Sequence, residues 1–228
     1  MSRSLFRQRK LRRWHRWIAL ATSIQLLLWT VSGIFFAFLN IDYVRGKHFF
    51  TDRAELSLDL SMLKPREFIA NQIVFKERMQ DEVIVGLMSE SGTSWQSLSG
   101  QPLDVLTSSQ VISLVATRTI LMPDSAEWVE QLELGSEYRN FSLPLWRVYG
   151  TINPGDVAYV DAFSGDILAV RHEAWRWWDF LWSLHIMNYD DRNSIGTLAL
   201  KFFSVLTCST VFLGLWLYWE TRGIVRHQ

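Results

Sequence analysis

The sequence predicts an α+β domain carried on a two-helix transmembrane anchor. Near each end of the chain lies an almost wholly apolar stretch of 22 residues, 18–39 and 198–219. Between them, helix-like and strand-like periodicities follow one another and are separated by turn residues. A chain of 228 residues with such ends leaves room for one domain of ordinary size.

The first apolar stretch, residues 18–39, contains no ionisable side chain. A helix of this length reaches roughly 33 Å at about 1.5 Å per residue, which matches the hydrocarbon thickness of a bilayer. The bilayer offers no water to backbone polar groups, so the segment must be helical. A cleaved signal peptide is the alternative. We expect an uncleaved anchor, because the apolar core is longer than usual and no A-x-A-like site follows Leu39.

The second apolar stretch, residues 198–219, carries Lys201 near its outer end, where a lysine can extend to the headgroups. Basic residues precede the first stretch and follow the second, so both termini are expected in the cytoplasm. Four tryptophans would form an inner aromatic belt: Trp14, Trp17, Trp216 and Trp219. The predicted segments are a basic cytoplasmic segment 1–17, a span 18–40, an outer domain 41–173, an interfacial aromatic helix and loop 174–196, a span 197–219 and a cytoplasmic tail 220–228.

The formal net charge of zero conceals a division along the chain. Residues 1–17 and 220–228 carry nine Lys or Arg against one Glu, a net of +8, and the remainder carries 14 against 22, a net of −8. This pattern is typical of basic cytoplasmic flanks around an acidic outer domain and gives no support to nucleic-acid binding. The single Cys208 excludes an intrachain disulfide.

In the first half of the domain, Leu56, Leu58 and Leu60 alternate as in a short strand. Residues 65–75 then have the apolar spacing of an amphipathic helix beginning at a proline. Residues 83–87 and 95–98 predict a hairpin about a Ser-Gly turn.

The second half has clearer signals. Thr107 to Gln110 has the form of a capping box, which predicts a helix to about Ile120. Strands are predicted at 128–134, 145–152, 157–163 and 166–170, with turns at 153–156 and 164–165. A helix followed by an antiparallel meander predicts an α+β layer pair in which the helix covers one face. The similar segments 98–103 and 163–168 suggest two related halves.

The stretch from Tyr159 to Leu168 reads YVDAFSGDIL. It resembles the PepSY module, whose signature is a strand, an Asp-Ala, a small-Gly turn and another strand. Asp161 can accept hydrogen bonds from the turn backbone, and Gly165 can supply a positive φ. Both roles are structural.

The chain ends extend this resemblance. Residues 13–17, RWHRW, lead into a span with a Ser-Gly pair, and residues 183–185, SLH, precede a span, as in the PepSY-associated transmembrane family. Some members are ferric-siderophore reductases that hold haem b between membrane histidines, and His185 and His15 would be the corresponding positions. The two histidines are predicted at opposite membrane faces, so each would need a second ligand from His48, from His172 or from another chain.

An interfacial histidine hydrogen-bonded to a backbone or lipid group is the structural interpretation of His185, and we favour it. Familiar catalytic motifs such as G-x-S-x-G, H-E-x-x-H and the P-loop do not occur in the sequence. The resulting expectation is a PepSY protein of a bacterial inner membrane, without a cofactor, whose periplasmic domain contacts an unidentified membrane or periplasmic protein, with a peptidase-regulating or accessory role. The alternative is a small haem b electron-transfer subunit serving iron uptake. Small residues in both spans would also allow a homodimer.

Overall fold

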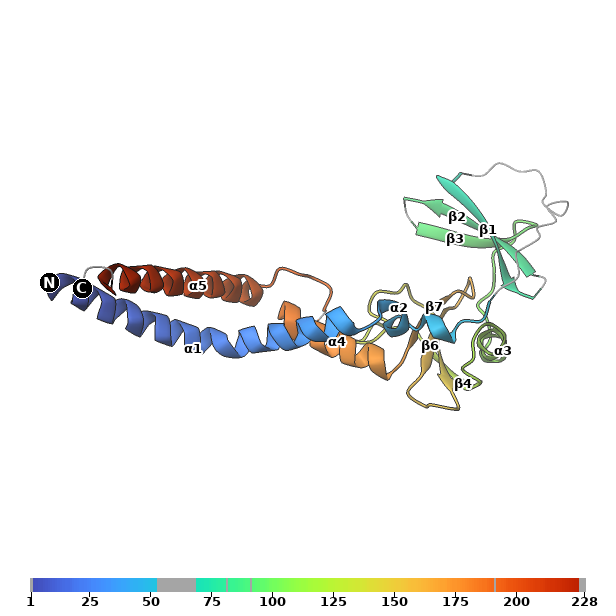
Figure 1. Cartoon of the computed structure of the whole chain (residues 1–228). Helices are drawn as coiled ribbons and strands as arrows, with labels where there is room; N and C mark the ends of the chain where they lie inside the picture. The colour runs from blue at the N-terminus through green and yellow to red at the C-terminus, as the bar shows by residue number, and fades with distance from the viewer. Residues whose placement is uncertain (1, 53–68, 81, 91, 191, 226–228) are drawn as a thin grey trace. The chain divides into compact units, whose positions relative to one another are not determined.

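The computed structural model describes residues 2–52, 69–80, 82–90, 92–190 and 192–225 (Figure 1). The chain divides into a helical unit, residues 1–39 and 177–228, and a domain unit, residues 40–176. Its described elements are α-helices, a short 3-10 helix and two antiparallel sheets. The predicted α+β class is confirmed.

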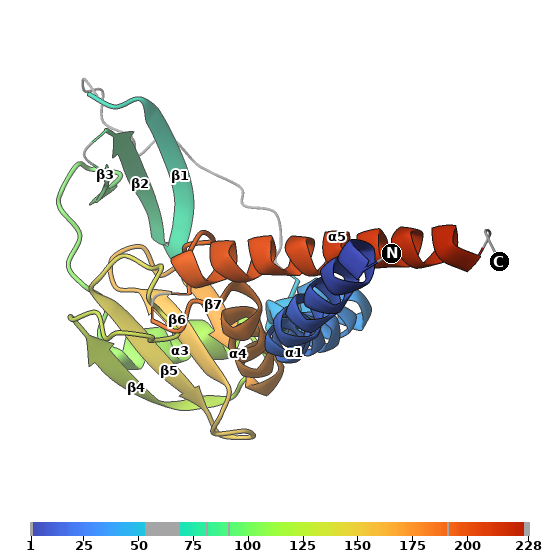
Figure 2. The same ribbon diagram turned by 90° about the vertical axis from the view of Figure 1, so that its left-hand side faces the viewer.

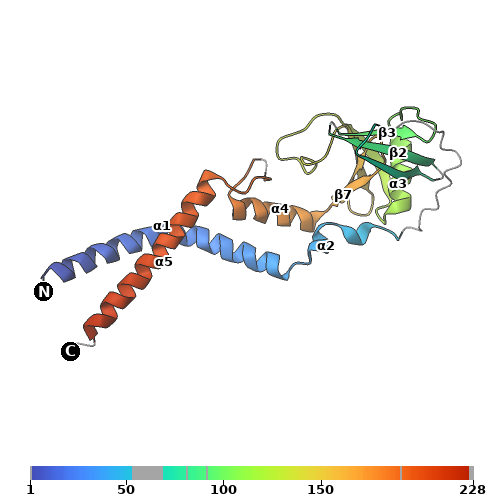
Figure 3. The same ribbon diagram turned by 90° about the horizontal axis from the view of Figure 1, so that it is seen from above.

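Two long helices make up most of the helical unit: α1, Ser2–Phe38, and α5, Leu198–Val225. Both are long and apolar enough to cross a membrane, over Arg9–Phe38 and Leu198–Glu220. They run antiparallel and cross each other (Figures 1 and 3). Small side chains allow a close approach, since the ring of His15 lies over the backbone of Gly214.

The predicted aromatic helix is α4, Glu173–Ile186. Within the helical unit it packs along α1: the ring of Phe36 lies 5.6 Å from that of Trp178 and 6.1 Å from that of Trp182. The loop after α4 is held by the Arg192–Asp179 ion pair at 2.5 Å and by hydrogen bonds from Asn188 to Ser194.

In the domain unit, one sheet has the strand order β4-β5-β6-β7, and α3 covers one of its faces (Figure 2). The elements are α3, Ser108–Arg118; β4, Pro123–Val129; β5, Leu145–Gly150; β6, Val157–Asp161; and β7, Ile167–Arg171. Thr107 and Gln110 form the predicted capping box. Val111, Leu114 and Val115 of α3 pack against Val148 and Val160 in the main core. The predicted helix-and-meander order is therefore confirmed.

The opposite face of this sheet is covered by residues 130–144. The predicted strand 128–134 is wrong in position, because β4 begins at Pro123 and ends at Val129. The segment leaves the sheet so that Tyr138 can pack on Tyr159 in a second small core, where its hydroxyl lies 3.5 Å from the carbonyl oxygen of Gln131. A tertiary contact thus overrides the local strand pattern.

The other sheet is a three-stranded meander of β1, Gln72–Met79, β2, Glu82–Ser89, and β3, Gly92–Ser97. The β2–β3 hairpin was predicted. The predicted helix 65–75 is wrong over its described part: residues 69–71 are not helical, and residues 72–75 pair with β2 as the start of β1. Residues 65–68 and the strand predicted at 56–60 lie outside the described residues. Pairing with β2 makes residues 72–75 a strand, and the periodicity of a single segment does not reveal such pairing.

The chain enters the domain unit through α2, Ile41–Val44, and a 3-10 helix, Lys47–Phe49. Val44 and Phe49 are buried, and Phe50 pairs with Thr119 in an isolated bridge. Asn40 caps α2 by accepting a hydrogen bond from the backbone N–H of Asp42 at 2.8 Å. This short segment is therefore part of the domain.

Candidate functional site

His185 lies at the last turn of α4, against α1. Its Nδ1 is 2.7 Å from Oγ of Ser32, and Ser32 also donates a hydrogen bond to the carbonyl oxygen of Leu28 at 2.7 Å. Nε1 of Trp29 donates to the carbonyl oxygen of His185 at 2.8 Å. Two side chains of α1 therefore fix both the ring and the backbone of His185.

Aromatic rings enclose the imidazole. The Trp182 ring is nearly parallel to it, at 8° and 6.4 Å between centroids, and the Phe36 ring meets it edge-on at 5.7 Å. Trp178 stacks in turn on Trp182 at 5.4 Å and 12°. Burial lowers the pKa of His185, which favours the neutral form of the ring.

His15 lies far from this cluster. It precedes Ser32 by 17 positions on the same helix, which corresponds to about 25 Å along the axis. Its Nδ1 is buried and has no hydrogen-bond partner among the described residues. His15 and His185 therefore do not converge on one site.

The two other described histidines, His48 and His172, lie together in the domain unit, 5.3 Å apart between ring centroids. Nε2 of His172 donates to the carbonyl oxygens of Tyr43 and Val44 at 3.0 and 3.1 Å. His48 stacks on the Tyr43 ring at 4.5 Å and 14°. Burial and the neighbouring His172 lower the pKa of His48, although Asp156 opposes this shift.

The positions of the histidines bear on whether the chain could bind haem. An axial histidine requires a neutral ring with its second nitrogen hydrogen-bonded, and His185 with Ser32 meets that requirement. A second ligand is not brought to it: the only other described histidine of the helical unit is His15. No group of three or more His, Cys, Asp or Glu among the described residues could hold a metal ion. A bis-histidine haem at His185 would therefore need a second ligand from outside the described residues of the helical unit.

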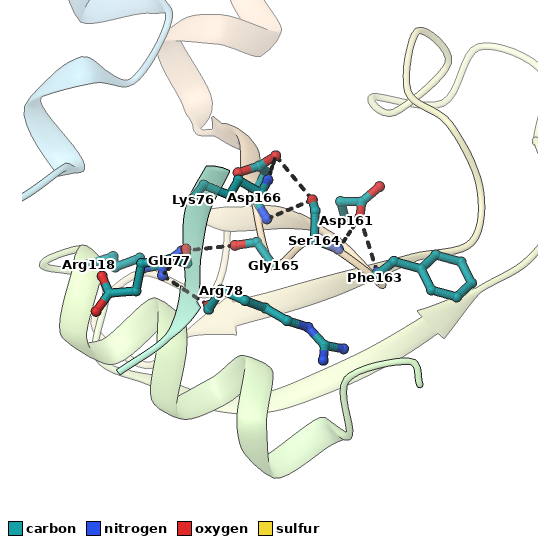
Figure 4. Close-up of polar contacts among 9 residues, drawn as sticks. All are labelled: Lys76, Glu77, Arg78, Arg118, Asp161, Phe163, Ser164, Gly165 and Asp166. Atoms are coloured by element: carbon teal, nitrogen blue, oxygen red, sulfur yellow. Dashed lines mark hydrogen bonds and ion pairs between the residues drawn. The ribbon is translucent and has the colours of Figure 1, made fainter. Parts of the chain in front are cut away.

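The predicted turn lies between β6 and β7 (Figure 4). Oδ1 of Asp161 accepts hydrogen bonds from the backbone N–H groups of Phe163 and Ser164, at 3.1 and 2.6 Å. Gly165 has φ +68°, and its N–H donates to the carbonyl oxygen of Asp161 at 3.0 Å. Both residues have the structural roles that the sequence indicated.

The same turn joins the two sheets of the domain. Lys76 of β1 forms an ion pair with Asp166, and its Nζ lies 4.1 Å from the centre of the Trp95 ring. Arg118 at the end of α3 donates to the carbonyl oxygens of Gly165 and Arg78, both at 3.0 Å, and of Glu77 at 3.3 Å (Figure 4). Lys76 of β1 and Arg118 of α3 therefore both connect the β6–β7 turn to the three-stranded sheet.

Sequence reasoning did not identify Lys76, Arg118 or Trp29 as site residues, because each acts across a long sequence separation. Two acidic residues, one on β4 and one in the loop after it, also have specific partners. Glu127 accepts from the Tyr149 hydroxyl at 2.5 Å, and Glu137 accepts from Nε of Arg176 at 2.5 Å.

No protein-family model, curated protein or solved structure matches this chain.

Proposed function

We propose that this chain is a membrane-anchored PepSY-type protein of a bacterial inner membrane, whose outer domain acts in the periplasm by binding another protein. The resemblance at the β6–β7 turn and the two helices able to span a membrane support this proposal. The turn itself offers no free catalytic group: Asp161 holds the turn backbone, and Asp166 pairs with Lys76.

The observation that carries the proposal is an apolar ridge of the domain, formed by Ile120, Met122 and Ile152. These side chains are 55%, 66% and 64% exposed. Met122 has a positive φ of 47°, and its carbonyl oxygen accepts hydrogen bonds from N and Oγ1 of Thr151, at 3.1 and 2.8 Å. The neighbouring loops are thereby fixed with their apolar side chains outward, an arrangement typical of protein contact surfaces.

Photo-cross-linking in intact cells tests the proposal. A photoreactive amino acid at Met122 or Ile152 should give a discrete adduct of higher mass. The matched control is the same substitution at Thr93, an exposed position of the other sheet, which should give none. The absence of an adduct at both ridge positions, in cells where the protein is present and folded, would contradict the proposal.

A second candidate is a haem b electron-transfer subunit, favoured by the Ser32–His185 hydrogen bond. It requires a second axial ligand, from His48, from His172 or from another chain. Protein purified from haem-replete membranes should then show a Soret band that shifts on reduction. His185→Ala and His185→Gln should both lose the Soret band, because neither side chain ligates iron well. His15→Ala tests in the same way whether His15, near the N-terminal end of α1, holds haem. A spectrum without a Soret band would rule out the haem b function.

A further inference from the structure

A line of polar side chains follows the face of α1 that meets α5 and α4. Thr22, Gln25 and Ser32 are 0%, 7% and 1% exposed. The hydroxyl of Thr22 donates to the carbonyl oxygen of Ile18 at 3.0 Å, and Ser32 is bonded as described above. Gln25 differs, because its buried side-chain nitrogen has no hydrogen-bond partner among the described residues.

A second unpaired group lies opposite, on α5. The hydroxyls of Thr22 and Thr210 are 3.5 Å apart, which fixes the register of the two antiparallel helices. One turn from this pair toward the outer end is Gln25 on α1, and one turn in the same direction on α5 is Thr207. Oγ1 of Thr207 is also buried without a partner in the described part of the chain. Two unpaired polar groups therefore share one depth in the helix pair.

An unpaired amide or hydroxyl within a bilayer is costly, because hydrocarbon offers no replacement for the lost hydrogen bond. We propose that a water molecule is bound between α1 and α5, accepting a hydrogen bond from Nε2 of Gln25 and donating one to Oγ1 of Thr207.

The neighbouring hydroxyls fit this assignment. Buried waters usually make about three hydrogen bonds to protein groups. Thr22 and Thr210 each donate to their own helix, Thr210 to the carbonyl oxygen of Leu206 at 2.9 Å, which leaves their oxygen lone pairs able to accept. The second proton of the water can therefore bond to one of these hydroxyls.

The sign of a stability change tests the site in the full-length protein. Gln25→Leu adds apolar surface, so it should stabilise the helix pair if the amide is unpaired. With the water bound, Gln25→Leu and Thr207→Val should each lower the folded-to-unfolded ratio about fivefold, and the double variant should lose little more than either single one. The measurement is unfolding by SDS in mixed micelles.

Matched controls lie on the exposed faces of the same helices. Ser23→Ala on α1 and Ser204→Ala on α5 remove hydroxyls that bond only to their own helix, and each should change the ratio less than about twofold. Unchanged or increased stability of Gln25→Leu would overturn the proposal.

A second measurement separates a water from a direct Gln25–Thr207 bond. In protein labelled with ¹⁵N-glutamine, the side-chain amide of Gln25, assigned by its loss in Gln25→Leu, should show cross-relaxation to a water molecule. If the stability losses of Gln25→Leu and Thr207→Val are non-additive but the Gln25 amide shows no cross-relaxation to water, the two side chains bond directly and the water assignment is overturned.

Discussion

Gly165 and Asp161 both stabilise the β6–β7 turn, Gly165 through its backbone conformation and Asp161 through its side chain. Asp161 accepts two backbone hydrogen bonds, and Gly165 adopts φ +68°. A Cβ at Gly165 would lie 2.9 Å from Cδ1 of Leu114 and 3.1 Å from the carbonyl oxygen of Arg78. The glycine is therefore required by conformation and by space.

Gly165→Val should destabilise the domain by about 1–3 kcal/mol, because it combines a strained φ with these contacts. Membrane insertion should be unaffected. The control is Gly155→Val, at a turn glycine without a positive φ, whose Cβ would meet Nη1 of Arg176 at 3.3 Å and should cost less. Thermal unfolding of the detergent-solubilised protein measures the difference. Equal midpoints for the two variants would contradict the assigned role of Gly165.

His48 should make the domain less stable in acid. Its pKa is lowered in the folded state, by burial and by His172 against the opposing Asp156, so the unfolded chain binds this proton more readily. The free energy of unfolding should then fall as the pH drops from about 6.5, the ordinary pKa of histidine, towards the lowered pKa of His48. It should recover as the pH rises again. His48→Phe keeps a ring beside Tyr43 and should flatten the dependence. Denaturant midpoints between pH 5 and pH 7 measure it, and an unaltered slope in the variant would argue against His48 as the source.

At the scale of elements, the loop 130–144 and the start of α4 are tied by Glu137. Its carboxylate accepts from Nε and Nη2 of Arg176 at 2.5 and 3.2 Å, and from the buried Tyr159 hydroxyl at 3.0 Å. Nη1 of Arg176 also donates to the carbonyl oxygen of Gly155 at 2.6 Å. One carboxylate thus joins a loop, a strand and a helix within the domain unit.

Glu137→Gln should cost about 1–2 kcal/mol of domain stability, since a charge-assisted pair becomes a neutral one beside a buried tyrosine. Glu127→Gln is the comparison: Glu127 pairs with Arg147 at 3.2 Å and accepts from the Tyr149 hydroxyl, but its carboxylate is more exposed than that of Glu137, so the loss should be smaller. Chemical unfolding of the two variants compares them. A larger loss for Glu127→Gln than for Glu137→Gln would refute this ranking.

At the scale of the whole molecule, the distribution of charge determines the expected topology. Basic residues gather before the apolar stretch 18–39 and after the apolar stretch 198–219, while the intervening chain is acidic. Two helices at the ends of the sequence bracket one domain unit. An even number of crossings would leave both termini on the same side.

Reporter fusions check this arrangement. Reporters placed before Arg3 or after Gln228 should be active only as cytoplasmic reporters, and one inserted near Ser91 only as a periplasmic reporter. The control is a fusion after Leu39, which should also report the periplasm. Cytoplasmic activity near Ser91 would reverse the proposed orientation.

The elements that sequence reasoning predicted correctly depend on neighbouring residues. The capping box of α3, the hairpin of β2 and β3 and the turn at Gly165 are all specified within a few positions. The incorrect predictions concern segments whose secondary structure depends on contacts with residues distant in the sequence. Residues 72–75 became a strand because β2 pairs with them, and residues 130–134 left the sheet to let Tyr138 reach Tyr159.

The sequence by itself determined the two apolar helices, because their length and near absence of charge match a bilayer. It also determined the β6–β7 turn, because Asp161 and Gly165 act on adjacent backbone. Only the tertiary structure decided which groups meet across the chain. It placed His185 on Ser32, separated Gln25 from any protein partner in the described residues, and clamped Asp166 with Lys76. Such pairings depend on the register of packed elements, which no local pattern encodes.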